Sequence, residues 1–298
     1  MKHKRKRAYS LEKFNYVDIL IYVFLIFLAI LTIYPFYNVI ILSFSNAKSV
    51  AEHNPYFWFH ALDLTGYKTV FNDGAFLKSL MNSFFITIVG VSLNMFLSVT
   101  GAYALSKKDL PGRNVFLVFI MITMLFNGGL IPYYLVVSDL NLTNTIWAMI
   151  FPTAINTFYL IIMKNYFLTI PPSLIEAAKI DGANELTVLF KVILPTAIPF
   201  ISAFALFYSV ERWNEWWNAY IFINEKSLYP LQIYLREVLI NYSSQISTQA
   251  QAILGNSKVY MQSVQMATIM VSAIPIICVY PFVQKHFVKG VMVGSIKE

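Results

Sequence analysis

The chain has 298 residues, of which 58% are hydrophobic and only 12% are charged. Soluble domains carry roughly 25% charged residues, so this composition indicates an integral membrane protein and excludes an ordinary soluble enzyme. The formal net charge is +7, and its densest basic cluster is MKHKRKR at the N-terminus, which in so apolar a chain favours a role in membrane topology over nucleic-acid binding.

Long gaps between charged residues predict the membrane-spanning helices. Six such gaps are strongly apolar and can each hold the ~20 residues that a spanning helix needs. They lie between Asp18 and Lys48, Lys78 and Lys107, Arg113 and Asp139, Asp139 and Lys164, Lys191 and Glu211, and Lys258 and Lys285. The fifth is expected to continue to about Tyr220, because the sequence there stays aromatic and apolar. The predicted fold class is therefore an all-α membrane protein with six transmembrane helices.

The distribution of Lys and Arg predicts the orientation of these spans. If the N-terminus lies inside, most of the 22 basic residues fall into loops and ends on the inner side of the membrane. The exceptions are Lys48, Lys68, Lys78, Arg212, Lys226, Arg236 and Lys258. Both termini are therefore expected in the cytoplasm. The predicted domains are a basic N-terminal segment 1–16, one transmembrane domain 17–284, and a cytoplasmic C-terminal tail 285–298.

Several kinds of enzymatic motif are missing from the sequence. It contains no GxxxxGK[ST] phosphate loop, no HExxH, no GxSxG and no paired-cysteine metal spacing, and Cys278 is the single cysteine. The four histidines lie far apart, near the expected membrane edges. The chain is therefore expected to have no catalytic residue, no metal site and no cofactor of its own.

The most informative stretch is residues 171–199, PPSLIEAAKIDGANELTVLFKVILPTAIP, which is polar and lies between the fourth and fifth predicted spans. Ser173 and Glu176 have the spacing of a capping box, which predicts the start of a short helix. Gly182 is expected to end it. A second helical piece over Glu185–Ile193 is expected to lead into the fifth span. From the residues alone, the stretch is either a solvated connector or a docking element.

Within this stretch, EAAKIDGANELTVLFKVILP resembles the EAA loop of ATP-binding-cassette (ABC) importer permeases. The pattern is EAA, three residues, Gly, nine residues, Ile, one residue and Leu-Pro, and Val192 stands at the Ile position. The resemblance implies that the loop is a cytoplasmic coupling helix that docks into a cleft of an ATPase subunit. The expected coupling residues are Glu176, Ala177, Ala178, Asp181, Gly182, Leu194 and Pro195.

The resemblance extends over nearly the whole chain, to six-span permeases of the carbohydrate uptake class such as the smaller permease subunit of the maltose importer. FNGGLIPYYLVV at 126–137, NTIWAMIFPTAINTFYLIIMKNYF at 144–167 and QKHFVKGVMVGSIKE at 284–298 are similar to the subgroup associated with complex, often acidic, oligosaccharides. A permease of this class is a multi-pass protein of the bacterial cytoplasmic (inner) membrane. The implied function is to form half of the translocation path for an oligosaccharide, including one that contains uronic acids.

The resemblance also implies partners. They are a second homologous permease, two ABC ATPase subunits that bind ATP and Mg, an extracytoplasmic solute-binding protein, the oligosaccharide and the lipid bilayer, and they include no nucleic acid. Closure of the ATPase dimer would move the coupling helices and switch the path from inward-facing to outward-facing.

A second stretch, residues 210–220, is a candidate wall of the substrate path. On a continuous helix Glu211, Glu215 and Asn218 would share a face, beside a stripe of Trp213, Trp217 and Tyr220. Charged groups in the bilayer are costly unless they face protein or water. The candidate residues are Glu211, Trp213, Asn214, Glu215, Trp217, Asn218 and Tyr220. The other interpretation is an interfacial aromatic belt, with an ion pair to the partner subunit.

Three alternatives to a sugar permease remain open at this point. One is a permease of the same machinery for a non-sugar solute, whose binding protein would hold a peptide, an ion or an amino acid. Another is a membrane scaffold or sensor, which would not copurify with an ATPase. The third is an intramembrane enzyme, which would show turnover by itself without ATP.

Overall fold

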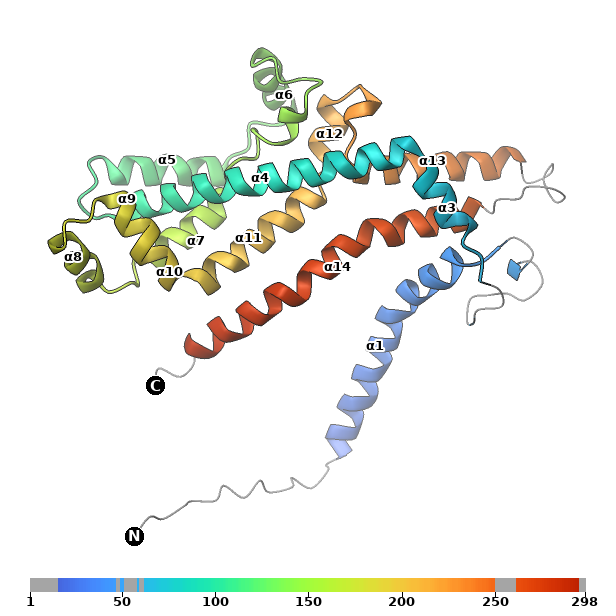
Figure 1. Ribbon diagram of the computed structural model, residues 1–298, viewed down its shortest axis with the longest axis horizontal. Coiled ribbons are helices and arrows are strands. Elements are labelled where there is room, and N and C mark those ends of the chain that lie inside the picture. Colours follow the sequence, from blue (N-terminus) through green and yellow to red (C-terminus); the bar gives the residue numbers. More distant parts are fainter. Residues whose placement is uncertain (1–15, 47–48, 51–57, 59–61, 250–260, 295–298) are drawn as a thin grey trace, which may run out of the picture.

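The computed structural model describes residues 16–46, 49–50, 58, 62–249 and 261–294. Within these residues the regular elements are all helical (Figure 1). They are α1 (Tyr16–Ser43), α3 (Thr65–Asn72), α4 (Gly74–Ser106), α5 (Arg113–Leu125), α6 (Leu130–Asp139), η1 (Ile146–Met149), α7 (Thr157–Phe167), α8 (Pro172–Ile180), α9 (Glu185–Val188), η2 (Leu189–Ile193), α10 (Leu194–Thr196), α11 (Ile198–Trp213), α12 (Trp217–Phe222), η3 (Lys226–Leu228), α13 (Leu231–Gln249) and α14 (Met261–Gly294).

The long helix α4 is the element against which most of the others pack. Its N-cap is Asp73, whose side chain accepts a hydrogen bond of 2.9 Å from the backbone N–H of Ala75, so the first turn is capped. Its buried residues recur every three or four positions and are mostly small or polar; they include Ser79, Ser83, Ile86, Gly90, Asn94 and Ser98. Small residues on such a face let neighbouring helices approach closely within a membrane.

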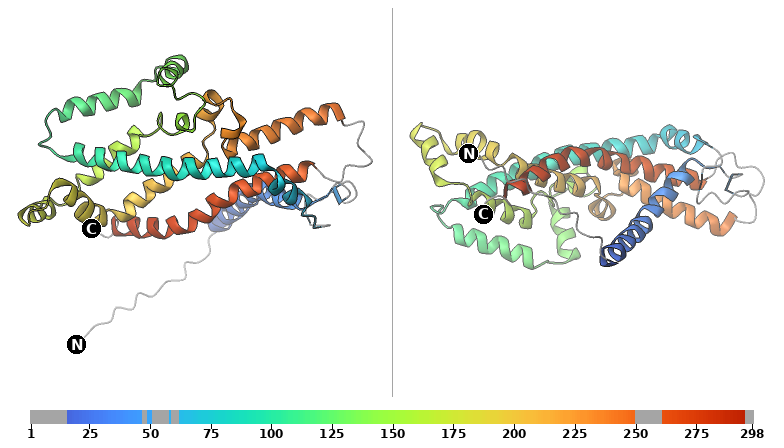
Figure 2. Two further views of the ribbon diagram at one scale, coloured as in Figure 1. Left: turned by 45° about the horizontal axis from the view of Figure 1, so that its top comes forward. Right: turned by 90° about the horizontal axis from the view of Figure 1, so that it is seen from below.

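Helices α7, α11 and α13 pack on α4, and α14 packs on α11, α1 and α3 (Figures 1 and 2). One apolar cluster joins α4, α7, α11 and the segment after α8, through buried residues such as Tyr103, Phe167, Leu189 and Tyr208. Most of α1 extends away from the other helices (Figure 1), and its apolar side chains are largely exposed. The core therefore fixes residues 185–197 directly onto the transmembrane helices.

The structure supports a multi-pass membrane protein but breaks several of the predicted spans. Three described helices are long and apolar enough to cross a membrane, and the number rises to six if each of three bent helix pairs counts as one span. The α5–α6 pair is bent by 119°, and the pair formed by α7 and α8 by 75°. The third pair, Glu185–Thr196 with Ile198–Phe222, is bent by 90°. The Arg113–Asp139 gap thus holds two helices rather than one.

The expectation of a continuous helix between Asp139 and Lys164 is wrong. Residues 140–156 form turns around the short helix η1, and α7 begins only at Thr157. Asn141 and Asn144 adopt positive φ angles, which end helical geometry. Irregular backbone is tolerated at membrane depth only where protein groups satisfy it, and the buried side chains described below do so.

The later part of the chain holds a helix outside the six predicted spans. Residues 231–249 form the helix α13. The predicted basic segment 1–16 lies outside the described residues except for Tyr16. Helix α14 continues to Gly294, so the first part of the predicted tail 285–298 is helical. The end of α14 lies at the same end of the molecule as α8 to α10 (Figure 1), which agrees with a common side for the C-terminus and the coupling stretch.

Candidate functional site

The predicted coupling stretch contains a short helix, α8, which lies at one extremity of the molecule (Figure 1). The helix begins at Pro172, and its N-cap Pro171 makes no side-chain capping bond. The expected capping box is therefore wrong: proline suits the first helical position because its φ is already fixed and its missing N–H would be unpaired there. This places Ser173 inside the first turn instead of at the cap.

The end of α8 is built as the sequence predicts. Gly182 has φ +81°, a conformation that L side chains rarely adopt. Its N–H donates to the carbonyl of Lys179 at 3.0 Å, and the N–H of Ala183 donates to the carbonyl of Ala178 at 2.9 Å. This pair of bonds is a Schellman motif, which pairs carbonyls at the end of a helix. The chain then turns sharply into α9.

The expected coupling residues fall into two groups in the structure. Ala178 is half-buried against the core cluster, whereas Glu176, Ala177, Asp181 and Gly182 are exposed on the outer side. Leu194 and Pro195 lie further on, next to the 90° bend before α11. The residues at the end of α8 are thus exposed apart from Ala178, whereas Leu194 and Pro195 lie on a later helix.

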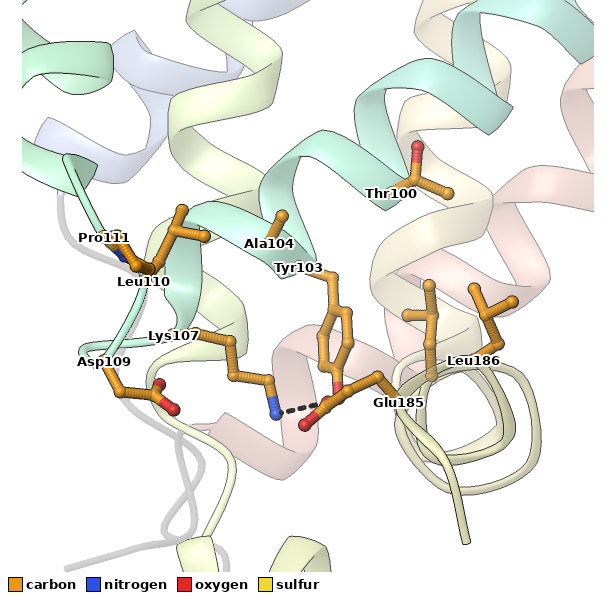
Figure 3. A pocket seen from close by; sticks show the side chains of 10 residues that line it. Thr100, Tyr103, Ala104, Lys107, Asp109, Leu110, Pro111, Glu185 and Leu186 are labelled. Atoms are coloured by element: carbon orange, nitrogen blue, oxygen red, sulfur yellow. Dashed lines mark hydrogen bonds and ion pairs between the residues drawn. The ribbon is translucent and has the colours of Figure 1, made fainter.

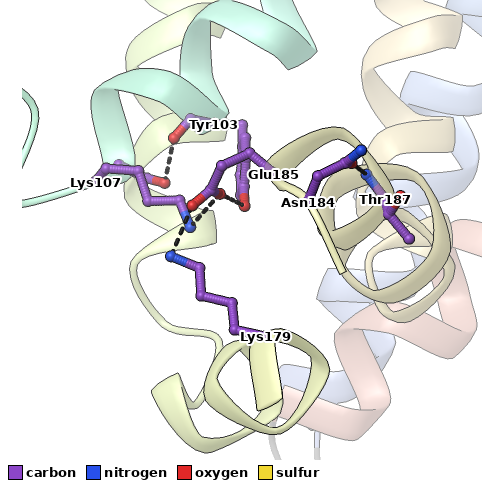
Figure 4. Close-up of polar contacts among 7 residues, drawn as sticks. Tyr103, Lys107, Lys179, Asn184, Glu185 and Thr187 are labelled. Carbon is purple, nitrogen blue, oxygen red and sulfur yellow. Dashed lines mark hydrogen bonds and ion pairs between the residues drawn. The ribbon is translucent and has the colours of Figure 1, made fainter. Parts of the chain in front are cut away.

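A polar cluster fastens this stretch to the end of α4 (Figure 4). The carboxylate of Glu185 lies 3.0 Å from Nζ of Lys107 and 2.7 Å from Nζ of Lys179. The hydroxyl of Tyr103 donates to the same carboxylate at 2.6 Å. Hydrogen bonds from Lys179 and Tyr103, with the nearby charge of Lys107, lower the pKa of Glu185 to about 2. We call Glu185, Lys107, Lys179 and Tyr103 the clasp.

Local sequence explains why Glu185 is presented to α4. Asn184 caps α9, and its side chain accepts a hydrogen bond of 2.8 Å from the N–H of Thr187. The cap fixes Glu185 at the first position of the helix (Figure 4). Tyr103 and Lys107 are four residues apart near the end of α4, so they project from one face. The clasp lies beside an open pocket of about 380 Å³, which Tyr103, Lys107, Glu185 and Leu186 help to line (Figure 3).

The predicted substrate stretch is broken rather than one continuous helix. α11 ends at Trp213 and α12 begins at Trp217. Glu215 lies in the break, where its carboxylate accepts bonds from the N–H and the side-chain amide of Asn218 at 2.9 and 3.0 Å. The predicted shared face of Glu211, Glu215 and Asn218 therefore does not exist as expected. Glu211 instead accepts a hydrogen bond of 2.6 Å from the hydroxyl of Tyr159 on α7.

The aromatic stripe is divided in the same way. Trp213 is buried, and its ring N–H donates to the carbonyl of Ser272 on α14 at 3.1 Å. Asn218 is also buried and accepts a bond of 2.8 Å from the hydroxyl of Tyr133 on α6. Trp217 and Tyr220 are exposed, as is Asn214. Four of the predicted path residues, these three and Glu211, are therefore exposed, whereas Trp213 and Asn218 hold the fold together.

Arg212 is a structural residue to which the sequence analysis gave no role. Its side chain is 3% exposed and, instead of facing a partner subunit, it donates to Asn94 and to oxygen atoms of the loop before α7. The loop acceptors are the carbonyls of Met149, Ile150 and Thr153 and the hydroxyl of Thr153, at 2.6 to 3.1 Å. These bonds pair loop carbonyls that are not paired within a helix. The signal for such a role was a lone arginine in an apolar run, which demands buried acceptors.

Comparison with known proteins identifies the architecture. Residues 9–293 match the family described as the binding-protein-dependent transport system inner membrane component. The chain belongs to this family. It is thus a component of a transport system in the bacterial inner membrane, a family of transport subunits and not of catalytic enzymes. The predicted resemblance to ABC importer permeases is confirmed.

Relatives of this inner membrane component extend along almost the whole chain. The polygalacturonan/rhamnogalacturonan transport system permease protein YtcP of Bacillus subtilis (strain 168) is 42% identical over 280 residues, covering 94% of this chain and 98% of that protein. Protein LplC of the same organism is 42% identical over 267 residues, covering 90% of each chain. A chain in the crystal structure of a bacterial ABC transporter for the import of the acidic polysaccharide alginate has 34% identity and a TM-score of 0.83, covering 92% of this chain and 99% of that one.

Proposed function

We propose that this inner membrane component is one permease subunit of an ABC importer for oligosaccharides, including acidic ones that contain uronic acid units. The proposal is supported by its relatives, one named for polygalacturonan and rhamnogalacturonan transport and another belonging to an alginate importer. It would pair with a second, homologous permease, and each of the two would form half of the translocation path. A solute-binding protein would deliver the sugar from outside.

In this proposal the exposed surface of α8 docks onto one of two ATPase subunits, which would bind ATP and Mg. The observation that carries it is the construction of the coupling stretch. Glu176, Ala177, Asp181 and Gly182 are exposed, while the clasp ties the next turn of chain to α4. A rigid connection of this kind passes a displacement of α8 to a transmembrane helix instead of absorbing it in a loop. Orientation with both termini in the cytoplasm would place this surface on the side of ATP.

The experiment is uptake by the complete importer reconstituted in vesicles with its binding protein. Reversing the charge at the coupling surface with Glu176→Lys should abolish ATP-dependent uptake of oligogalacturonate while the protein remains in the membrane. Asp139→Lys makes the same change on an exposed residue at the end of α6 and should leave uptake near the wild-type rate. Normal uptake by Glu176→Lys would show that α8 does not couple the ATPase.

The substrate class is tested separately with the wild-type complex. Uptake of oligogalacturonate or alginate oligosaccharides supports the proposal. A binding protein that holds a peptide, an amino acid or an ion, and a complex that transports that solute and no oligosaccharide, would assign the machinery to a non-sugar solute.

A further inference from the structure

An arginine of α13 lies over two exposed aromatic rings at the start of α12. The guanidinium carbon of Arg236 is 4.2 Å from the ring centre of Tyr220 and 5.6 Å from that of Trp216. Tyr220 is 59% exposed and Trp216 is 42% exposed, so other parts of this chain leave much of both side chains uncovered. Such cation–π contacts hold a guanidinium plane in place and leave its edge nitrogens free to donate.

One guanidinium nitrogen of Arg236 has no hydrogen-bond partner within the part of the chain that the structure describes. This nitrogen, Nη1, is buried. The neighbouring carboxylate, Glu237, is directed to Lys226 at 3.3 Å instead. A buried donor left unpaired is costly. Arg212, by comparison, donates five hydrogen bonds. The described part of the chain therefore gives Nη1 of Arg236 no acceptor, unlike the nitrogens of Arg212.

Two amide side chains are joined by a hydrogen bond at the start of α13. Gln232, one helical turn before Arg236 on α13, donates a hydrogen bond of 3.2 Å to the side-chain oxygen of Asn214, which is exposed in the break between α11 and α12. Planar amides beside exposed aromatic rings can hydrogen-bond sugar hydroxyls while the rings cover the apolar face of a pyranose. A guanidinium in the same place matches a carboxylate, which it can bind with two parallel hydrogen bonds.

We infer that Arg236, Tyr220 and Trp216 form a binding site for the carboxylate-bearing unit of an acidic oligosaccharide. Arg236 pairs with the uronate carboxylate, and the rings of Tyr220 and Trp216 support the sugar ring beside it. The inference rests on the proposed function, and it adds the residue that distinguishes an acidic sugar from a neutral one. An uncharged sugar would keep the ring contacts but leave Arg236 unpaired. The site would therefore bind an uncharged sugar with lower affinity than an acidic one.

The test is uptake by the complete reconstituted importer with two probes, oligogalacturonate and its partly methyl-esterified form. The same binding protein delivers both probes to every variant, so its own preference cancels in the ratio of variant to wild type. Arg236→Gln should raise the KM for oligogalacturonate by about tenfold or more, the effect of losing a charge-assisted hydrogen bond, and should change the KM for the ester far less. Tyr220→Ala should raise the KM for both probes.

Lys78→Gln is the matched control, because it removes one positive charge from an exposed side chain near the start of α4, the helix on which α13 packs. It should leave both KM values unchanged. Equal losses for both probes in Arg236→Gln, or a complex that no longer assembles, would overturn the inference and assign Arg236 to packing. An unchanged KM for oligogalacturonate would also overturn it. If the wild type takes up neither probe, the proposed substrate class fails, which is a different result from any of these.

Discussion

The Nε of Arg212 donates a hydrogen bond of 2.9 Å to the side-chain oxygen of Asn94, near the middle of α4. The amide nitrogen of Asn94 in turn donates to the carbonyls of Thr153 and Ala154 at 2.9 and 3.0 Å. Two side chains that are 118 positions apart thus replace the hydrogen bonds that the irregular loop before α7 cannot make within itself. This arrangement allows the chain to cross the interior of the molecule without a continuous helix.

Replacement of this arginine should be severe even when the charge is kept. Arg212→Lys keeps the positive charge but has one nitrogen in place of the planar fork, so several loop oxygens lose their donors. We expect the protein to lose about 2–3 kcal/mol of folding free energy. The measurement is the midpoint temperature of thermal unfolding of the purified complex, which should fall. Arg113→Lys is the control, because that half-buried arginine donates a single bond, at 2.8 Å to the carbonyl of Leu105. A midpoint equal to that of the control would contradict the role of Arg212.

Gly90 provides the space that Arg212 occupies. A Cβ at Gly90 would lie 2.9 Å from both Cδ and Nε of Arg212, and the arginine cannot move aside without breaking its hydrogen bonds. Gly90→Ala should therefore destabilise the protein by about 1–3 kcal/mol, as overpacking does. At Gly74, in the first turn of the same helix, an added Cβ meets nothing within 4 Å. Gly74→Ala should be close to neutral in the same thermal measurement, and equal effects of the two changes would refute the explanation.

Trp213 and Trp217 should respond differently to truncation although they are four residues apart. Trp213 is buried and bonded to Ser272, so Trp213→Ala should cost about 3–5 kcal/mol and reduce the amount of assembled complex. Trp217 is 48% exposed, and Trp217→Ala should leave the amount of complex nearly unchanged. The measurement is the yield of intact complex after solubilisation. Normal yield with impaired uptake in Trp213→Ala would instead favour a direct contact with substrate.

The clasp should contribute a small stability that is insensitive to pH near neutrality. Because the pKa of Glu185 is lowered from 4.5 to about 2, its stabilisation is fully present above the unfolded value and is lost as the pH falls through about 2. Glu185→Gln should therefore lower thermal stability by a constant amount from pH 8 to about 5, by less than about 1 kcal/mol because the group is half exposed. The difference from the wild type should shrink below that range.

The same substitution should affect uptake more than stability, since the clasp joins the coupling stretch to α4. Asp139→Asn is the control, because that carboxylate is exposed at the end of α6, away from the coupling stretch. Uptake by Glu185→Gln equal to that of Asp139→Asn would show that the clasp transmits no motion.

Sequence by itself determined the membrane class, the family and the place of the coupling stretch. These follow from long apolar runs, the spacing around Glu176 and Gly182, and the need for glycine at φ +81°, all of which are local properties of neighbouring residues. The predicted cap at Ser173 failed locally too, because a proline one position earlier is the better first residue of a helix. The cap at Asn184 was available from sequence, since asparagine before Glu185 is a common start of a helix.

Only the tertiary structure decided which polar residues bond within the fold and which stay exposed. Arg212 and Arg236 are both arginines in a largely apolar chain, and both could have been partner contacts. Arg212 meets acceptors from α4 and from the loop before α7, whereas Arg236 meets aromatic faces and its Nη1 has no acceptor in the described part of the chain. Burial cost makes any charged group in this chain seek partners, but where those partners lie depends on how distant segments pack, which no local pattern records.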